Sequence, residues 1–195
     1  MINPTCITRY DESESQLMEK LHFWILAAGK GGVAAASALE RLYKRLPHAR
    51  MPFDRVLLYC TVHGEIGLRR LMKDCGIGCS TLKARAFISL AKKRPNLFKD
   101  GPDELMEHPG IGPKTARGFI LHSRRNVRYA CLDRHILRWL RDQGHTHAPK
   151  DTPSSSLQYD RWEAIWLAAC YAMGRTSAEL DLEVWNSYAS KVTNN

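Results

Sequence analysis

The stretch Leu105-Met106-Glu107-His108-Pro109-Gly110-Ile111-Gly112-Pro113-Lys114-Thr115-Ala116 holds two glycines and two prolines in close succession. Pro109 ends one short helix, expected over 102–108, and Pro113 fits the first turn of the next, expected over 114–122. The glycines let the backbone between them turn tightly with its amides exposed. Such amides and a helix N-terminus both favour phosphate oxygens, so the stretch predicts an element that grips a phosphate backbone without reading bases. An ordinary corner between two helices also needs glycine and is the alternative.

The charge of the chain is concentrated around this stretch. The 195 residues carry a net charge of +9, and the segment Lys83–Arg141 alone holds fourteen basic and five acidic residues, which equals the whole excess. A basic segment inside a folded region, rather than a basic tail, indicates a polyanion held against a shaped surface. A merely solvated basic face is the alternative.

Length and composition narrow the class of protein. The chain is long enough for one domain with a substantial core or for two small helical subdomains. Hydrophobic residues make up 44% and charged residues 25%, which excludes a disordered chain, a collagen-like fibre and a disulfide miniprotein. No apolar run approaches the roughly 18 residues that cross a bilayer. The N-terminal 20 residues are acidic and lack the basic flank of a signal peptide.

A chain without a signal peptide is expected in a reducing compartment, where cysteines stay free thiols. The prediction covers all six cysteines: Cys6, Cys60, Cys75, Cys79, Cys131 and Cys170. We expect a cytoplasmic protein, associated with the nucleoid in a bacterium or archaeon, or a nuclear one in a eukaryote.

Apolar spacing predicts an all-α protein, since no alternation is long enough to build a sheet. Further helices are expected over 15–28, 33–46, 64–75, 83–93, 132–144, 159–173 and 177–191. The segment 49–61 is less regular, with Pro52 as a first-turn residue, and 145–156 is the best linker. Two subdomains with a cleft between them are expected, one formed by 1–52 plus 145–195 and the other by 53–144, with the hairpin at 105–116.

The hairpin resembles the helix-hairpin-helix of the DNA glycosylases of the endonuclease III and 8-oxoguanine glycosylase superfamily. Leu132-Asp133-Arg134-His135-Ile136 resembles the superfamily's aspartate segment, with Asp133 nineteen residues beyond Lys114. The resemblance runs over about 16–191. Near its end, Glu179-Leu180-Asp181-Leu182 with Trp185 is similar to the tail of the small archaeal-type 8-oxoguanine glycosylases.

The resemblance implies a bifunctional enzyme that excises a damaged base, 8-oxoguanine, and then nicks the strand by β-elimination. Two rivals stay open. One is a glycosylase for oxidised pyrimidines, as in endonuclease III, and the other is a non-catalytic DNA-binding module. A binding module needs the hairpin glycines but has no use for Asp133 at that interval from Lys114.

The chemistry of the two residues fits such an enzyme. Positive charge develops on the sugar as a base leaves, so a nearby carboxylate stabilises the transition state, and Asp133 is the candidate. It could equally be a helix cap, and both roles are compatible. An unprotonated amine can attack the anomeric carbon and hold the sugar as a Schiff base, and Lys114 is the candidate. Its alternative role is to bind phosphate at the hairpin.

Other positions follow from the resemblance. Gly110, Gly112, Thr115 and Lys83 are expected to hold the DNA backbone. Leu26-Ala27-Ala28-Gly29-Lys30 resembles the segment that carries a residue invading the duplex, which makes Gly29 and Lys30 candidates. Ile77-Gly78 with Lys83-Ala84 resembles the wedge loop, with Cys79 at the wedge position.

Four aromatic residues near the C-terminus divide into two groups. Trp185 is a candidate for stacking on an extruded base, with a core role as the rival. Tyr159, Trp162 and Trp166 lie at helical spacing and are interpreted as core.

No cofactor is expected. An iron–sulfur loop needs four closely spaced cysteines, whereas Cys170 stands alone near the C-terminus. Cys75 and Cys79 lack a second pair for zinc, and His145-Thr146-His147 is a weak metal spacing, interpreted as surface residues of the linker. By resemblance, a monovalent ion at the hairpin carbonyls is an open alternative. The expected partner is double-stranded DNA that contains a damaged base. We expect the protein to be a monomer and not to bind a membrane.

Overall fold

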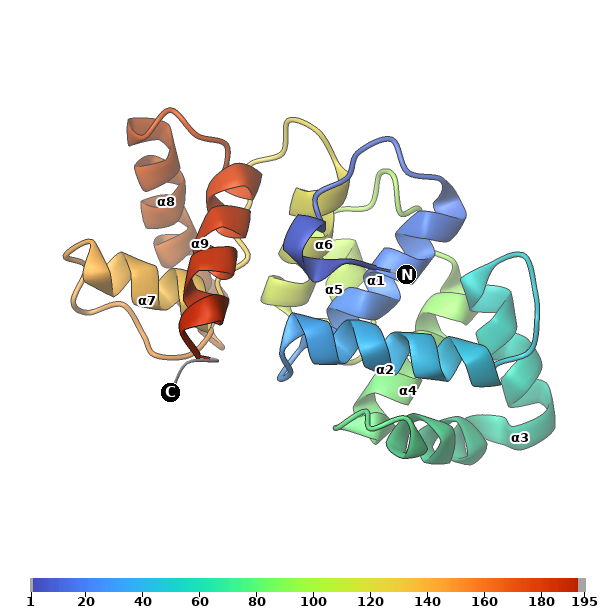
Figure 1. The fold of residues 1–195 in the computed structure, drawn as a ribbon. Helices are drawn as coiled ribbons and strands as arrows, with labels where there is room; N and C mark the ends of the chain where they lie inside the picture. The colour runs from blue at the N-terminus through green and yellow to red at the C-terminus, as the bar shows by residue number, and fades with distance from the viewer. Residues whose placement is uncertain (1, 193–195) are drawn as a thin grey trace.

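The computed structural model describes residues 2–192, with side chains through Tyr188, and this part of the chain is helical without a strand (Figure 1). This confirms the all-α prediction. A short 3-10 turn, η1 (Pro4–Cys6), precedes nine helices: α1 (Glu14–Ala27), α2 (Gly32–Arg45), α3 (Pro52–Asp74), α4 (Ser80–Lys93), α5 (Pro102–Met106), α6 (Pro113–Ser123), α7 (Arg134–Asp142), α8 (Ser156–Ala172) and α9 (Ser177–Val192).

Local sequence signals account for where these helices begin. Ser13 caps α1 in a capping box with Gln16, in which each side chain binds the other's backbone amide. Proline opens α3, α5 and α6, where its missing amide costs nothing. In α3 the predicted break is present as a kink at Gly64, whose φ of 64° suits glycine, so that 49–61 and 64–75 form one bent element.

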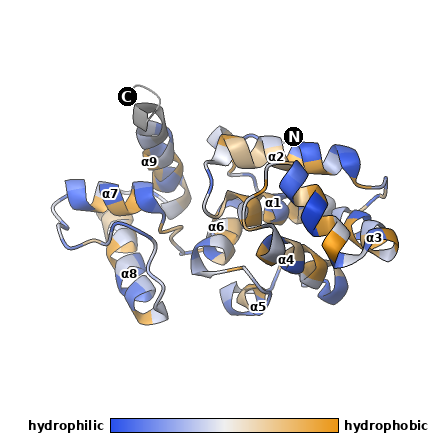
Figure 2. Cartoon of the chain, turned by 90° about the horizontal axis from the view of Figure 1, so that it is seen from below, coloured by the Kyte–Doolittle hydropathy of each residue, from blue (hydrophilic) through white to orange (hydrophobic). Residues whose placement is uncertain are grey.

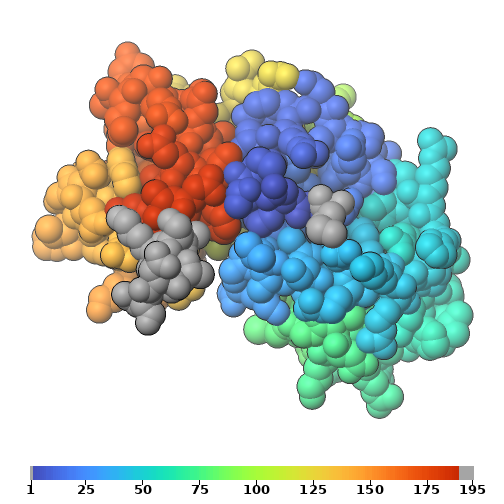
Figure 3. Space-filling model, viewed as in Figure 1, coloured from blue at the N-terminus to red at the C-terminus, as the bar shows by residue number. Residues whose placement is uncertain are grey.

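Two hydrophobic cores divide the described residues into two bodies. The first core takes its buried side chains from 7–131, mainly from α1 to α6, together with Ala178. The second takes its buried side chains from 130–188, that is from α7, α8, α9, the segment before α7 and Ala148 in the loop after it. In the space-filling view the bodies lie side by side, with the N-terminal segment at their joint (Figure 3).

The predicted division into subdomains is therefore wrong. The segments 1–52 and 145–195 do not form a core of their own, because α1 packs against α2, α3, α4 and α6, and of the second segment only Ala178 belongs to that core. Helix α1 is buried over nearly its whole circumference, which places it at the centre of the first body (Figure 2). The C-terminal pair instead packs on α7, and α9 meets α6 and η1 at the joint.

All six cysteines are free thiols, as predicted. In the described part of the chain, no helix is both long enough and apolar enough to cross a bilayer.

Candidate active site

A cavity of about 1030 Å³ opens at the joint between the two bodies. The first body contributes the end of α1, the loop that leads into α2, and the hairpin between α5 and α6. The second body contributes the start of α7, part of the 143–155 loop and the first turns of α9. The cavity thus brings together segments that are more than 150 residues apart in the sequence, and Lys114, Asp133 and Trp185 all line it.

The hairpin has the tight geometry that its glycines predict. Gly110 has a φ of +82°, and a Cβ atom there would lie 2.8 Å from Cγ of Leu82, so only glycine fits without a shift. His108 anchors the turn through Nδ1, which lies 2.8 Å from the hydroxyl of Ser89. Gly112 precedes α6 without a side-chain cap. The first amides of α6 are therefore left for other acceptors, beside Lys114 in the same turn.

Asp133 is fixed at the start of α7. Its Oδ1 atom accepts hydrogen bonds from the amides of His135 (2.8 Å) and Ile136 (3.0 Å), which confirms its role as the helix cap. A capping carboxylate of this kind is held in one orientation and keeps its second oxygen for other partners.

The backbone before Asp133 is pinned by α8. The hydroxyl of Tyr159 donates to the carbonyl of Ala130 (2.8 Å) and accepts from the amide of Leu132 (3.0 Å). The carboxylate of Glu163 accepts from the amide of Ala130 at 2.7 Å. These contacts leave the segment little freedom, so Asp133 enters the cavity from a rigid support.

Asp181 is a second carboxylate in the cavity wall, which the sequence did not single out as a site residue. It lies on α9, is 7% exposed, and its Oδ2 atom is 2.9 Å from Nε2 of His122 on α6. On the other side of that ring, Nδ1 lies 2.7 Å from the hydroxyl of Thr8. The only available signal was its place in the short motif of 179–182.

The charged groups of the cavity act on one another. Burial raises the pKa of the Asp181 carboxyl, Asp133 raises it further, and His122 and Lys114 oppose the rise. Burial likewise raises the pKa of the Cys131 thiol well above its ordinary value, with Asp181 and Asp133 adding to the rise and Lys114 opposing it. The buried Cys131 thiol is therefore held neutral in the wall of a cavity that one amine and two carboxylates also line.

Aromatic side chains form the apolar part of the wall. The ring of Trp24 stacks on His122, with centroids 5.6 Å apart and planes within 13°. Trp185 is partly exposed in the cavity, and a Cβ atom at Gly32 would lie 3.1 Å from its ring. Trp185 is therefore not a core tryptophan, and it presents an aromatic surface to whatever enters.

The two loops proposed to invade a duplex lie next to each other. Gly29, with a φ of +73°, is exposed, and Nζ of Lys30 donates to the carbonyl of Gly76 in the loop before α4. Gly29 and Lys30 line the cavity. Cys79 is exposed in a left-handed conformation at the start of α4, outside the cavity lining.

Lys83 does not have the position that the sequence suggested. Its side chain is buried, at 7% exposure for the residue, and Nζ donates to the carbonyls of Leu26 and Ala28, both at 3.1 Å. Those carbonyls belong to the end of α1, where unsatisfied acceptors need donors. Lys83 therefore holds α1 in place, and we withdraw it as a contact to a DNA backbone.

Part of the basic segment is likewise structural. Arg117 pairs with Asp160 (2.8 Å) and Glu163 (3.3 Å), and Arg124 donates to two backbone carbonyls between α4 and α5. Thr115 is buried but reaches the cavity lining. The cations that line the cavity are Lys30, Lys114 and Arg134, and the last of these was not predicted as a site residue.

The hairpin between α5 and α6, the aspartate that caps α7 and the cavity between two helical bodies are the defining features of this fold. No family model matches the chain. Three solved structures resemble it over most of their length.

A Methanocaldococcus jannaschii 8-oxoguanine glycosylase/lyase in complex with a 15mer DNA containing 8-oxoguanine matches with a TM-score of 0.70 and 20% identity, covering 92% of this chain and 84% of that one. A second structure of an 8-oxoguanine DNA glycosylase from the same organism gives 0.68 and 22%, covering 92% and 81%. The Thermotoga maritima 8-oxoguanine DNA glycosylase gives 0.64 and 24%, covering 90% and 80%. At these identities the likeness establishes the fold.

Proposed function

We propose that this protein is a DNA glycosylase with associated lyase activity, which excises 8-oxoguanine from double-stranded DNA and nicks the strand. The observation that carries the proposal is that Lys114 and Asp133 line one cavity together, although they lie on different bodies. The similar proteins of M. jannaschii and T. maritima are 8-oxoguanine glycosylases, which supports the same substrate here.

In the proposed reaction the damaged nucleotide turns out of the duplex into the cavity. Lys114 attacks the anomeric carbon as a free amine, the bond from that carbon to the base breaks, and the base leaves with a proton. Positive charge builds on the sugar as that bond breaks, and the carboxylate of Asp133 stabilises it. Because the backbone cap fixes Asp133, this stabilisation requires no rearrangement at the moment of reaction.

The amine and the opened sugar then form an imine between Nζ of Lys114 and the former anomeric carbon. The imine acidifies the neighbouring C2′ hydrogen. Removal of that proton expels the 3′ phosphate and nicks the strand, and water releases Lys114 from the product. The uncapped amides of α6 and the tight turn at Gly110 would hold phosphates beside the lesion during these steps.

The base itself meets Asp181 and Trp185. A buried carboxylate that is held by His122 is suited to accept hydrogen bonds from the polar edge of a purine, and Trp185 offers a stacking face. The cavity volume of about 1030 Å³ accommodates a purine nucleotide.

Borohydride trapping tests the proposal. The protein is incubated with a labelled duplex that holds one 8-oxoguanine opposite cytosine, beside duplexes that hold an abasic site or thymine glycol. We expect a covalent adduct on the 8-oxoguanine duplex that disappears in Lys114→Gln. Lys44→Gln is the matched control, because that side chain is 72% exposed at the far end of α2, and it should trap normally.

Each other result has a definite meaning. An adduct on the abasic and thymine-glycol duplexes without one on the 8-oxoguanine duplex would keep the lyase and assign the protein to oxidised pyrimidines. No adduct on any duplex, with tight binding to all of them, would identify a non-catalytic binding module. If Asp133→Asn excised 8-oxoguanine at the rate of the parent protein, Asp133 would not stabilise the transition state.

A further inference from the structure

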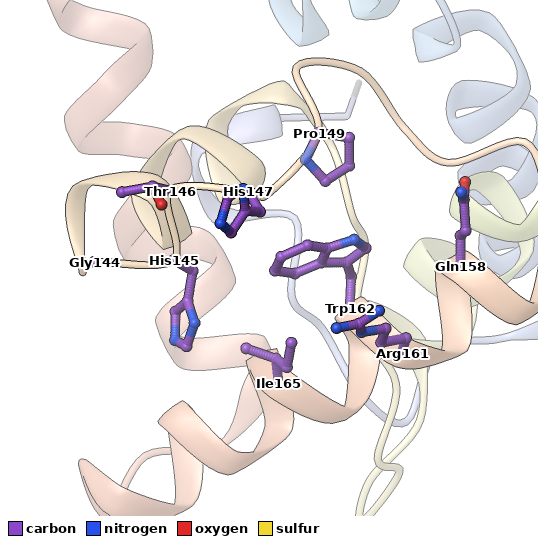
Figure 4. A pocket seen from close by; sticks show the side chains of 9 residues that line it. All are labelled: Gly144, His145, Thr146, His147, Pro149, Gln158, Arg161, Trp162 and Ile165. Carbon is purple, nitrogen blue, oxygen red and sulfur yellow. The ribbon is translucent and has the colours of Figure 1, made fainter.

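A second cavity, of about 460 Å³, lies entirely within the second body. It opens between the loop that follows α7 and the first half of α8, and it shares no lining residue with the cavity that contains Lys114. Figure 4 shows the indole of Trp162 in the middle of its lining, with His147 on the loop side and Arg161 and Ile165 on α8. His145 and Gln158 also line this cavity.

The loop wall of this cavity is preformed, although the sequence suggested a linker at 145–156. Nη1 of Arg141 donates to the carbonyls of Ala148 (3.1 Å) and Pro149. The amide of His145 donates to the carbonyl of Leu140 at 3.0 Å. The amide of Ala148 donates to the carbonyl of His145 at 2.8 Å. A loop held by this many bonds needs little ordering when a ligand binds.

Trp162 differs from the two aromatic residues beside it on α8. Tyr159 and Trp166 are fully buried, at 0% exposure, as the sequence predicted for all three. Trp162 is only partly buried: one part of it packs on the second core and another part lines the cavity. The core interpretation is therefore incomplete for this residue, since its indole offers an open aromatic surface.

The electrostatic character of the lining selects for negative charge. No aspartate or glutamate lines this cavity, whereas Arg161, His145 and His147 do. Among the described residues Arg161 forms no ion pair, so its guanidinium is available to a ligand. An aromatic surface next to a free guanidinium matches a flat ring that carries a phosphate. The volume is that of one small-molecule site.

We propose that this cavity binds one unpaired nucleotide, with its base on the indole of Trp162 and its phosphate on Arg161. Helix α7 connects the two cavities, because Asp133 caps its start and the 144–149 loop follows its end. Its nine residues span about 14 Å, or about four steps of a DNA strand at 3.4 Å each. The nucleotide is therefore either a free one or part of a single strand beside the substrate, and its binding does not require Lys114.

The experiment is a titration of the full-length, ¹⁵N-labelled protein that follows the tryptophan indole NMR signals, with Trp162 assigned from Trp162→Phe. The probes are deoxyguanosine 5′-monophosphate, a five-nucleotide single strand without damage, and inorganic phosphate. We expect the nucleotide to shift the Trp162 signal. We also expect Arg161→Gln, an exposed position whose change leaves the core intact, to weaken binding about tenfold or more.

The variants separate this proposal from the proposed function. Lys114→Gln should bind the nucleotide with unchanged affinity, whatever its activity on DNA. If the single strand binds more tightly than the free nucleotide, the source is a DNA strand; equal affinities identify the free nucleotide, and both results support the site. The site is refuted if the Trp162 signal does not move, if phosphate alone binds as well as the nucleotide, or if the shift survives Arg161→Gln unchanged but disappears in Trp185→Ala.

Discussion

Nε2 of His122 lies 2.9 Å from Oδ2 of Asp181, and this contact joins α6 of the first body to α9 of the second. The His122 ring is fully buried, stacked on Trp24 and bonded on its other side to Thr8. Helix α9 thus supplies the backbone of Asp181, and the first body holds its carboxylate. The two bodies must be docked for this contact to hold the carboxylate in the cavity wall.

Asp181→Asn is expected to impair base excision selectively. Asparagine keeps the shape but replaces one acceptor with a donor, so a base edge that donates two hydrogen bonds loses one and meets a repulsive contact. Single-turnover excision of 8-oxoguanine should fall about tenfold or more, whereas borohydride trapping on an abasic duplex stays near the parent level. Glu183→Gln, on an exposed part of α9, is the control and should change neither. Equal losses in both assays would show a general effect on folding or docking.

Arg134→Gln is expected to weaken the binding of duplex DNA by the same factor for every sequence. It should also make that binding less dependent on salt. Arg134 lines the cavity and is exposed, in contrast to Arg117 and Lys83, whose charges are used inside the protein. Each phosphate contact makes the slope of log K against log salt more negative by about 0.9. The magnitude of the slope should therefore become smaller by about one in the variant. Binding of an undamaged duplex between 50 and 200 mM salt, roughly the range over which this effect is large, measures it. Arg50→Gln, an exposed position between α2 and α3, should leave the slope unchanged.

The hairpin glycine can be tested against a glycine of the same conformation elsewhere. Gly110 and Gly174 both have positive φ, at +82° and +62°, so alanine costs about 1–2 kcal/mol of backbone strain at either. Only at Gly110 does the new Cβ also meet a neighbour, Leu82, whereas it meets nothing within 4 Å at Gly174. Gly110→Ala should therefore reduce affinity for duplex DNA severalfold by moving the turn. Gly174→Ala should lose only the stability that its positive φ costs and should keep its affinity for DNA, and a parallel loss of affinity in both variants would mean that the turn does not contact DNA.

The spacing of Lys114 and Asp133 was readable in the sequence because each sits at a helix start with strong local signals. Glycine and proline mark the first start, and the capping aspartate marks the second. Both signals act within a few residues of the chain, so they do not depend on the rest of the fold.

The site residue that the sequence did not reveal and the assignments that were wrong all depend on packing between distant parts of the chain. Asp181 becomes part of the site only because α9 crosses α6, and a periodic pattern does not say which helices meet. The division into bodies was wrong for the same reason, since the second half of α1, 21–27, is apolar on nearly every side except at His22, and this pattern does not select a neighbour. Lys83 was misassigned because a lysine at a wedge loop looks the same in sequence whether it faces solvent or caps a distant helix end.

His22 gives the protein a specific sensitivity to acid. Its imidazole is fully buried, stacked on Phe87 with centroids 3.7 Å apart, and Nδ1 lies 2.8 Å from the hydroxyl of Tyr43. Nε2 is buried without a hydrogen-bond partner among the described residues. Burial lowers the pKa of His22 from 6.5 to about 3, because the core removes the water that would stabilise the charged ring.

The sign of the effect follows from proton binding in the two states. Between pH 6.5 and about 3 the unfolded chain binds a proton at this histidine and the folded protein does not, so the free energy of unfolding falls as the pH falls through that range. The loss approaches about 1.4 kcal/mol per pH unit.

His22→Gln removes the titrating group. Although it lowers stability at neutral pH through poorer packing, its unfolding free energy should depend less steeply on pH. Urea unfolding at pH 6.5, 5.5 and 4.5, roughly the upper half of this range, measures the slopes. His48→Gln, an exposed position, should retain the parent slope, and a His22→Gln slope equal to that of the parent would assign the acid sensitivity to other groups.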